Sequence, residues 1–291
     1  MFDKVLIANR GEIAVRINRA CQELGISTVA IHSEADSDSM HVRIADESVC
    51  IGPNPVNKSY LNAHSIIAAC EITGANAVHP GYGFLSENPS FAKMLEDHKL
   101  TFIGPKHSHI KAMGDKIQAK KIMKDFGVPT VPGSDKAVED EKDAINISKE
   151  IGFPVLIKAS AGGGGRGMKV VENEKQLVDS LPIIKQEALS FFGNDAVYIE
   201  KFIDSPRHIE VQVICDIHGN FIHLYERDCS VQRRNQKVIE EALAPGIDDE
   251  KKEKLFSICV NAMKKMEYLG LGTLEFLYEN GEFYFMEMNT R

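Results

Sequence analysis

The first hundred residues alternate short apolar segments with helical patterns, and this alternation constrains the fold more than any other feature of the chain. Strands are expected at Val5–Ala8, Ser27–His32, Ala77–His79 and Thr101–Ile103. Helices are expected at Glu12–Leu24 and Leu61–Thr73, each followed by a glycine that tolerates the left-handed conformation of a helix end. Strands that alternate with helices predict an open, parallel, Rossmann-like α/β sheet with helices on both faces.

Two polar motifs fall where ligands of such a sheet bind, beyond the carboxyl ends of its strands. Asn9-Arg10-Gly11-Glu12 follows the first expected strand, and His79-Pro80-Gly81-Tyr82-Gly83-Phe84 begins at the end of the third. Both motifs are therefore candidates for ligand contact.

The second half of the chain has a different pattern, typical of an α+β domain. A helix is expected at Lys116–Phe126, and Gly127–Gly133 has two prolines and two glycines in seven residues, which predicts a linker. Two later helices are expected at Glu174–Ser190 and Asp249–Met266. Strands are expected at Val155–Lys158, Met168–Val171, Val197–Glu200, Glu210–Asp216, Phe221–Glu226, Thr273–Tyr278 and Phe283–Asn289.

Composition excludes several classes of protein. The net charge of −8 leaves no broad basic surface for a nucleic-acid backbone, and no apolar run is long enough to span a membrane. The six cysteines are scattered without a Cys-x-x-Cys pair, which argues against disulfides and zinc and favours reduced thiols in a cytoplasm.

A glycine run, Gly162–Gly167, lies between the strand that ends at Lys158 and the expected strand Met168–Val171. A Walker A loop or a dinucleotide fingerprint would continue into a helix, so neither matches. A strand–glycine–strand hairpin instead predicts a lid over phosphates, because glycine amides approach anions closely and Lys158 and Arg166 add positive charge. The alternative is a surface hairpin without a ligand.

Glu275, Glu287 and Asn289 lie on the last two expected strands and offer the oxygen ligands that Mg²⁺ prefers. A two-residue Asn-Gly turn between these strands would put Glu275 and Glu287 on opposite faces. A three-residue loop, Glu279-Asn280-Gly281, would put them on the same face as diagonal neighbours. We therefore predict the three-residue loop; the alternative is a pair of solvent-facing acids on an edge hairpin.

Several motifs together resemble a known family. Phe153–Gly167 and Phe285–Arg291 are similar to signatures of the ATP-grasp ligases, and Ile7–Ala14, His79–Asn88 and Glu226–Ser230 narrow the resemblance to the biotin carboxylases. The resemblance covers the whole chain and is greatest to the biotin carboxylase subunit of bacterial acetyl-CoA carboxylase. It implies a Rossmann-like N-terminal domain at 1–113 and an ATP-grasp domain at 114–291, incomplete at its C-terminus, with a glycine-rich lid at about 131–203.

The resemblance also implies a reaction and its components. ATP and bicarbonate form carboxyphosphate, which carboxylates biotin on a carrier protein in the first half-reaction of acetyl-CoA carboxylase in fatty acid synthesis. One or two Mg²⁺ ions, or Mn²⁺ in their place, assist. The implied partners are a biotin carboxyl carrier protein, carboxyltransferase subunits and a second copy in a homodimer, with no nucleic acid and no membrane.

Individual residues take implied roles by motif position. The ATP phosphates are expected to contact Lys116, Lys158, Gly164 and Gly165, and the adenine is expected to contact Glu200, Lys201, Phe202 and Ile203. His208, Gln232 and Asn235 match ribose or phosphate contacts, and Glu275, Glu287 and Asn289 match magnesium ligands, the two glutamates also facing ATP. By the same resemblance, Lys237 and Arg291 are expected to be the catalytic and bicarbonate-binding residues.

The chain departs from the family pattern twice. Asn235 stands where the family usually has histidine, so this contact keeps a hydrogen bond but cannot carry charge. The chain also stops at Arg291, where the family continues with a glutamate that serves as base, an arginine near biotin and much of the dimer surface. We therefore expect this chain alone to bind ATP weakly and to turn over poorly or not at all.

Other functions remain open from the sequence. The chain could be the biotin carboxylase domain of a pyruvate or acyl-CoA carboxylase, another ATP-grasp ligase such as a carbamoyl-phosphate synthase half, or a non-catalytic nucleotide-binding module. A dinucleotide-dependent oxidoreductase is disfavoured, because the first strand–helix turn lacks the glycine fingerprint.

Overall fold

The computed structural model describes residues 2–134, 136–160 and 167–291, which form two compact units. Unit 1 consists of Met1–Lys111 with Tyr268–Leu271 and Thr290–Arg291, and unit 2 consists of Ala112–Glu267 with Gly272–Asn289. Among the described residues, no helix combines the length and apolar character needed to cross a membrane.

The parallel sheet predicted for the first hundred residues is confirmed in unit 1. Its strand order is β3-β2-β1-β4-β5, and every neighbouring pair is parallel. The strands are β1 (Lys4–Ile7), β2 (Ser27–Ser33), β3 (Glu47–Gly52), β4 (Ala77–His79) and β5 (Thr101–Phe102). Of these, β3 was not predicted.

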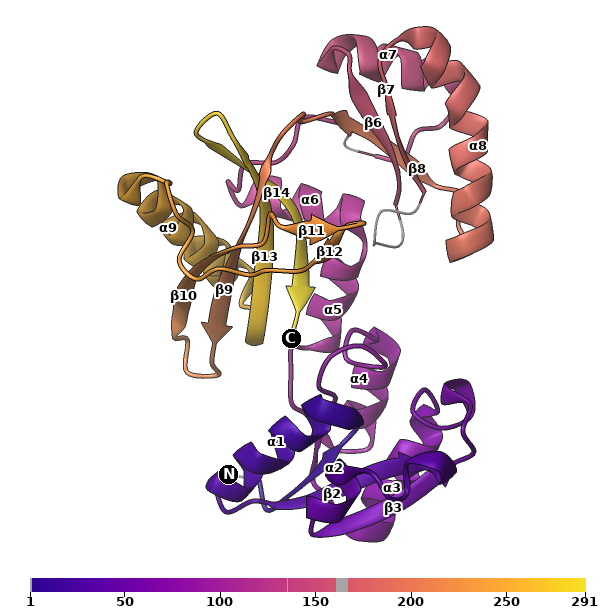
Figure 1. The fold of residues 1–291 in the computed structure, drawn as a ribbon, viewed down its shortest axis with the longest axis vertical. Coiled ribbons are helices and arrows are strands. Elements are labelled where there is room, and N and C mark those ends of the chain that lie inside the picture. Colours follow the sequence, from indigo (N-terminus) through magenta and orange to yellow (C-terminus); the bar gives the residue numbers. More distant parts are fainter. Residues whose placement is uncertain (1, 135, 161–166) are drawn as a thin grey trace. The chain divides into compact units, whose positions relative to one another are not determined.

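Helices cover both faces of this sheet, as expected (Figure 1). Val5 and Ile7 of β1 pack in a core with Ile17 of the first helix, whereas Leu6 packs in a second core with Ile66 of the third helix. The alternation of side chains along β1 therefore divides the core in two. The helical elements are α1 (Gly11–Glu23), α2 (Met40–Ile44), α3 (Ala63–Thr73), α4 (Pro89–Asp97), α5 (His107–Gly114) and the 3₁₀ turns η1 (Glu34–Asp36) and η2 (Val56–Lys58).

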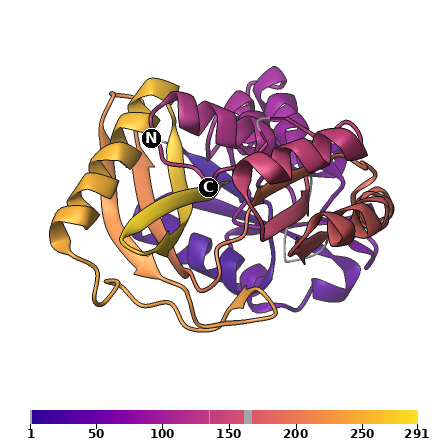
Figure 2. The same cartoon turned by 90° about the horizontal axis from the view of Figure 1, so that it is seen from above.

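Unit 2 contains a four-stranded sheet in the order β10-β9-β13-β14. Helix α9 (Asp249–Met266) packs on its β9–β10 side, and both ribbon views show it alongside these strands (Figures 1 and 2). The strands are β9 (Arg207–Cys215), β10 (Phe221–Asp228), β13 (Gly270–Glu279) and β14 (Glu282–Thr290), and a small hairpin of β11 (Gln232–Arg233) and β12 (Gln236–Lys237) lies beyond β10 in sequence.

A second sheet of unit 2 has the antiparallel order β7-β6-β8 and packs against two helices. Its strands are β6 (Val155–Ala159), β7 (Met168–Val171) and β8 (Val197–Lys201), and its helices are α7 (Glu141–Ile151) and α8 (Glu174–Phe192). Strands do flank the glycine run, since Lys158 pairs with Met168. Residues 161–166 themselves lie outside the described residues.

The segment from Gly127 to Gly133 is not the linker that its prolines and glycines predict. Val128 and Val131 are buried, Thr130 bridges Phe285 of β14, and Gly133 bridges Glu200 of β8. The segment follows α6 (Lys116–Asp125), and it forms backbone bridges to a strand of each sheet in unit 2. Backbone hydrogen bonding therefore holds it in place despite its composition.

The predicted three-residue loop between the last two strands is wrong. The turn has two residues, Asn280 and Gly281, with φ of 51° and 88°, so Glu279 pairs with Glu282. Both are in the left-handed region, as this turn type requires, and an Asn-Gly sequence favours it over a longer loop.

An extra residue in β14 has the effect that we expected from the longer loop. Leu271 and Arg291 exchange two backbone hydrogen bonds, yet Leu271 lies eight positions before Glu279 whereas Arg291 lies nine positions after Glu282. One strand therefore contains a β-bulge. In β14 the buried positions switch from Phe283 and Phe285 to Met288 and Thr290, so the bulge lies between Phe285 and Met288.

Candidate active site

Glu275 lies at the centre of a polar cluster whose members include several residues that the sequence predicts for the site. Its side chain comes from β13 and is only 6% exposed. Its Oε1 accepts hydrogen bonds from Asn289 Nδ2 (2.7 Å) and Lys237 Nζ (2.8 Å), and its Oε2 lies 3.0 Å from Nε2 of His208. Burial favours the neutral acid, but His208 and Lys237 outweigh burial and lower the pKa of Glu275 to about 2.

Lys237 joins this carboxylate to a second one. Its ammonium also contacts Glu210 of β9, which is 2% exposed, and Glu210 accepts a hydrogen bond of 2.6 Å from Nε of Arg227. Burial would lower the pKa of Lys237, but hydrogen bonds to the two carboxylates raise it above its ordinary value. Charges thus alternate in the order Arg227, Glu210, Lys237 and Glu275, which satisfies buried ionic groups that would otherwise be costly.

The β11–β12 hairpin places Gln232 directly opposite Lys237. Its two turn residues, Arg234 and Asn235, both have positive φ (52° and 61°), a conformation that asparagine tolerates better than most residues. From this hairpin, Gln232 donates from Nε2 to Nδ1 of His208 and to the carbonyl of Cys229, both at 2.9 Å. The hairpin therefore brings Lys237 to Glu275 and Gln232 to His208 of β9, while Asn235 is exposed at its tip.

The expected magnesium ligands fit a hard cation in their chemistry. Glu287 and Asn289 are two residues apart in β14 and share one of its faces, and Asn289 contacts Glu275 directly. Two carboxylates and an amide offer the oxygen atoms that Mg²⁺ takes from proteins. The Glu287 carboxylate forms an ion pair with Lys116, whose Nζ lies 2.8 Å from Oε2 of Glu287.

Lys158 and Glu200, expected at the phosphates and the adenine, contact each other. Lys158 Nζ donates to Oε2 of Glu200 at 2.7 Å, and Lys120 Nζ donates to Oε1 at 2.9 Å. Burial would raise the pKa of Glu200, but the two lysines outweigh it and lower that pKa.

Two backbone N–H groups of the expected adenine segment already form hydrogen bonds within the protein. The backbone N–H of Lys201 donates to the carbonyl of Pro132 and that of Phe202 donates to the carbonyl of Pro154. Ile203 follows the end of β8 and lies in irregular backbone. If this segment binds adenine, groups other than these two N–H donors must contact the base.

Arg291 lies in unit 1, where its Nη1 is 3.0 Å from Oε1 of Glu87. Glu87 also accepts hydrogen bonds from the backbone N–H and the hydroxyl of Thr290. This glutamate, from the motif that begins at His79, therefore holds Thr290 and Arg291 in place. The expected lid residues Gly164 and Gly165 lie outside the described residues.

Our sequence analysis gave no role to Glu210 and Arg227, which belong to the Glu275 network, or to Lys120, which contacts Glu200. A signal existed for Glu210, since His208, Glu210 and Gln212 alternate with buried apolar residues and so share one face of β9. Within the described residues, ligand atoms of His208, Glu210 and Glu275 all lie within 4.8 Å of one another. Lys120 had no comparable signal, because its partner is 80 residues away.

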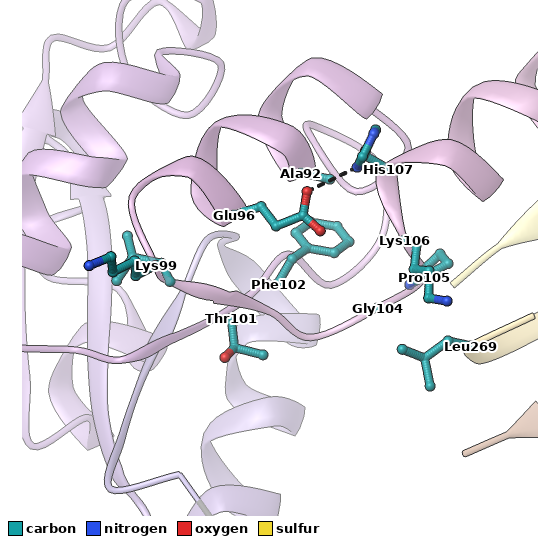
Figure 3. A pocket seen from close by; sticks show the side chains of 11 residues that line it. Ala92, Glu96, Lys99, Thr101, Phe102, Gly104, Pro105, Lys106, His107 and Leu269 are labelled. Atoms are coloured by element: carbon teal, nitrogen blue, oxygen red, sulfur yellow. Dashed lines mark ion pairs between the residues drawn. The ribbon is translucent and has the colours of Figure 1, made fainter. Parts of the chain in front are cut away.

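A cavity of about 340 Å³ lies in unit 1 and is separate from these contacts. Figure 3 shows Glu96 and His107 pointing toward each other at this cavity, and their ion pair measures 3.1 Å. None of the predicted site residues that the structure describes lines it. The candidate site is therefore identified by its ionic contacts.

Family models match both parts of the chain. "Biotin carboxylase, N-terminal domain" matches residues 1–110, and "Carbamoyl-phosphate synthase L chain, ATP binding domain" matches residues 115–291. Among curated relatives, biotin carboxylase of Pseudomonas aeruginosa is 60% identical over 100% of this chain and 65% of its own length. The mitochondrial propionyl-CoA carboxylase alpha chain of Mus musculus is 54% identical over 100% of this chain and 40% of its own length.

Solved structures show the same similarity. A biotin carboxylase complex with β,γ-ATP from Campylobacter jejuni matches with a TM-score of 0.96 and 49% identity, covering 100% of this chain and 66% of that one. The biotin carboxylase domain dimer of Hydrogenobacter thermophilus 2-oxoglutarate carboxylase, in complex with MgADP, ADP and bicarbonate, matches with a TM-score of 0.95 and 52% identity. This second match covers 100% of this chain and 64% of the Hydrogenobacter thermophilus chain. The chain thus spans about two thirds of most of these proteins.

Proposed function

Because the chain belongs to the biotin carboxylase family, we propose that it carries out the ATP-dependent carboxylation of biotin by bicarbonate through carboxyphosphate. We assign residues 1–113 to a Rossmann-like N-terminal domain and residues 114–291 to an ATP-grasp domain with a lid at about 131–203. The reaction needs three things from the protein: positive charge around the phosphates, a metal site and a cation for bicarbonate.

Positive charge around the triphosphate comes from Lys116 and Lys158, aided by the amides of Gly164 and Gly165. Phosphoryl transfer is catalysed mainly by positioning and by neutralising charge on the moving group. A Mg²⁺ ion on Glu275, Glu287 and Asn289 would supply more of this neutralisation. The ion pair between Lys116 and Glu287 supports this reading, because it brings a phosphate-binding cation to a metal-binding carboxylate.

Lys237 and Arg291 are assigned to bicarbonate. Glu210 and Glu275 hold the Lys237 ammonium from two sides and keep it charged at neutral pH. Arg291 offers a permanently charged, planar donor that suits bicarbonate or the biotin enolate, and Glu87 orients it. His208 and Gln232 are assigned to ribose or phosphate, and the exposed Asn235 supplies at most an uncharged hydrogen bond there.

The observation that carries the proposal is the contact between Lys237 and Glu275. It brings the expected bicarbonate cation within 2.8 Å of the expected metal ligand, so bicarbonate held by Lys237 would lie close to a phosphoryl group held by the metal. ADP formation from Mg-ATP tests it. We expect slow release of ADP that depends on bicarbonate and rises with free biotin, and its loss in Lys237→Met. Binding of Mg-ADP, measured by calorimetry, tests the nucleotide site independently of turnover.

A carbamoyl-phosphate synthase half is the second candidate, because the family model for residues 115–291 carries that name. The model for residues 1–110 favours biotin carboxylase instead. ADP formation that responds to ammonia and not to biotin would support the second candidate.

The physiological context is also part of the proposal. We assign the chain to acetyl-CoA carboxylase and fatty acid synthesis in the cytoplasm, with a biotin carboxyl carrier protein and carboxyltransferase subunits as partners. The pyruvate and acyl-CoA carboxylases remain alternative contexts. A homodimer is supported by the dimeric biotin carboxylase domain of Hydrogenobacter thermophilus.

A further inference from the structure

Glu200 is shared by two lysines through its two oxygen atoms. The carboxylate lies on β8 and is 5% exposed, so it has little access to water. Lys158 of β6 contacts Oε2 at 2.7 Å, and Lys120 of α6 contacts Oε1 at 2.9 Å. One buried anion between two cations leaves a net charge of +1 on these three side chains, so the cluster can accept a further anion.

The two lysines differ in what else they can reach. Lys158 is the penultimate residue of β6, the strand before the glycine run, and its side chain is 17% exposed. Lys120 is the more enclosed, with 11% of its side chain exposed, and it lies one helical turn after Lys116 on α6. Helix α6 therefore directs Lys116 to Glu287 and Lys120 to Glu200.

We infer that Lys120 is a positioning residue, which neutralises Glu200 so that the charge of Lys158 is available to nucleotide phosphates. The inference rests on the proposed function, and Lys120 acts through Glu200 without touching the nucleotide. Without Lys120, Lys158 is the sole counter-charge of a buried carboxylate. A phosphate must then compete with Glu200 for one ammonium, and the local field loses a full positive charge.

The test compares the purified parent chain with Lys120→Met. Calorimetry measures the affinity of each protein for ADP and for adenosine. We expect ADP binding to weaken about tenfold, because the field on the phosphates falls, while adenosine binding stays within about twofold. A role confined to structure would weaken both ligands alike. Lys120→Arg keeps the charge and should keep ADP affinity, and Lys121→Met removes an exposed charge from the same helix as a control.

Glu200→Gln provides a background in which no carboxylate needs neutralising. In that background Lys120→Met should weaken ADP binding by much less than tenfold, because Glu200 no longer competes for Lys158 and only the direct field of Lys120 is lost. Equal ADP affinity of Lys120→Met and the parent chain overturns the inference, as does an equal loss for adenosine or an undiminished tenfold loss in the Glu200→Gln background. If the parent chain binds ADP and only these comparisons fail, the proposed function stands; if it binds no ADP, both fall.

Discussion

Asn289 donates a 2.7 Å hydrogen bond from Nδ2 to Oε1 of Glu275, across the last two strands of the chain. The bulge in β14 makes this contact possible, because it turns Asn289 onto the face that carries Glu275. The amide Oδ1 of Asn289 then remains as a potential metal ligand, whereas Oε2 of Glu275 lies 3.0 Å from Nε2 of His208. A consequence is that metal and nucleotide binding should depend on each other through Glu275.

Glu275→Gln should abolish the effect of Mg²⁺ on ADP binding. The variant removes a hard anionic ligand, and an amide oxygen is a weaker ligand for Mg²⁺. In the parent chain, ADP with Mg²⁺ should raise the melting temperature more than ADP with a chelator, and in the variant the two increments should be equal. Glu282→Gln, at an exposed position of β14, should behave as the parent chain. A Mg²⁺ increment that survives in Glu275→Gln would remove this residue from the metal site.

Lys237→Met should destabilise the fold by about 3 kcal/mol, since it leaves two buried carboxylates facing each other without their shared cation. Urea denaturation at neutral pH measures the change. Adding Glu210→Gln to the variant should recover part of the loss, because one buried charge is removed. Lys254→Met, an exposed substitution on α9, serves as the control. An unchanged free energy of unfolding would mean that the carboxylates are better solvated than their burial indicates.

Gly281→Ala should cost about 1 kcal/mol, because Gly281 has a φ of 88° that a Cβ atom disfavours. The new methyl group would also collide with Nζ of Lys251 unless that flexible side chain moves. Asn280→Gly, at the neighbouring turn position with φ 51°, should be tolerated. Urea denaturation of both variants measures the difference, and equal stability would argue against the two-residue turn.

Elements with strong local signals could be predicted from the sequence. Helix α9 begins and ends as predicted at Asp249 and Met266, because Asp248 caps it and its buried positions follow the helical period. Helix α4 was missed although Asn88 caps it and Pro89 occupies its first turn. The residues up to Asn88 were interpreted as a functional motif and not as the start of a helix. Strand β3 was missed because only Val49 and Ile51 carry its apolar alternation, a short signal that pairing with β2 supplements.

The contacts of the site were less predictable, because they join distant segments. Resemblance pointed to Lys158 and Glu200 separately, but nothing local indicates that Lys120 completes their cluster. The bulge between Phe285 and Met288 likewise has no local signature, and it is detected only when the turn and the far end of the hairpin are compared. Pairwise geometry of this kind depends on tertiary structure.

The stability of the chain should decrease between pH 6.5 and pH 4 through His79. Burial lowers the pKa of this imidazole from 6.5 to about 4, and its Nδ1 accepts a 3.1 Å hydrogen bond from the backbone N–H of Gly81. The unfolded chain therefore takes up a proton that the folded chain refuses. The contribution is complete above pH 6.5, falls as the pH decreases, and is lost once the pH passes below about 4, by about 3 kcal/mol in total. Urea denaturation at pH 7, 6, 5 and 4 should show this slope.

His79→Asn isolates the effect, because an asparagine oxygen can accept the same hydrogen bond from Gly81 but does not titrate. The variant should lose the slope that His79 contributes over this interval while its stability at pH 7 changes little. His98→Asn is the matched control, since His98 is exposed at the end of α4 and should leave the slope intact. If the parent chain and His79→Asn show the same dependence on pH, the folded and the unfolded chain protonate His79 over the same pH range. Burial would then not lower the pKa of His79.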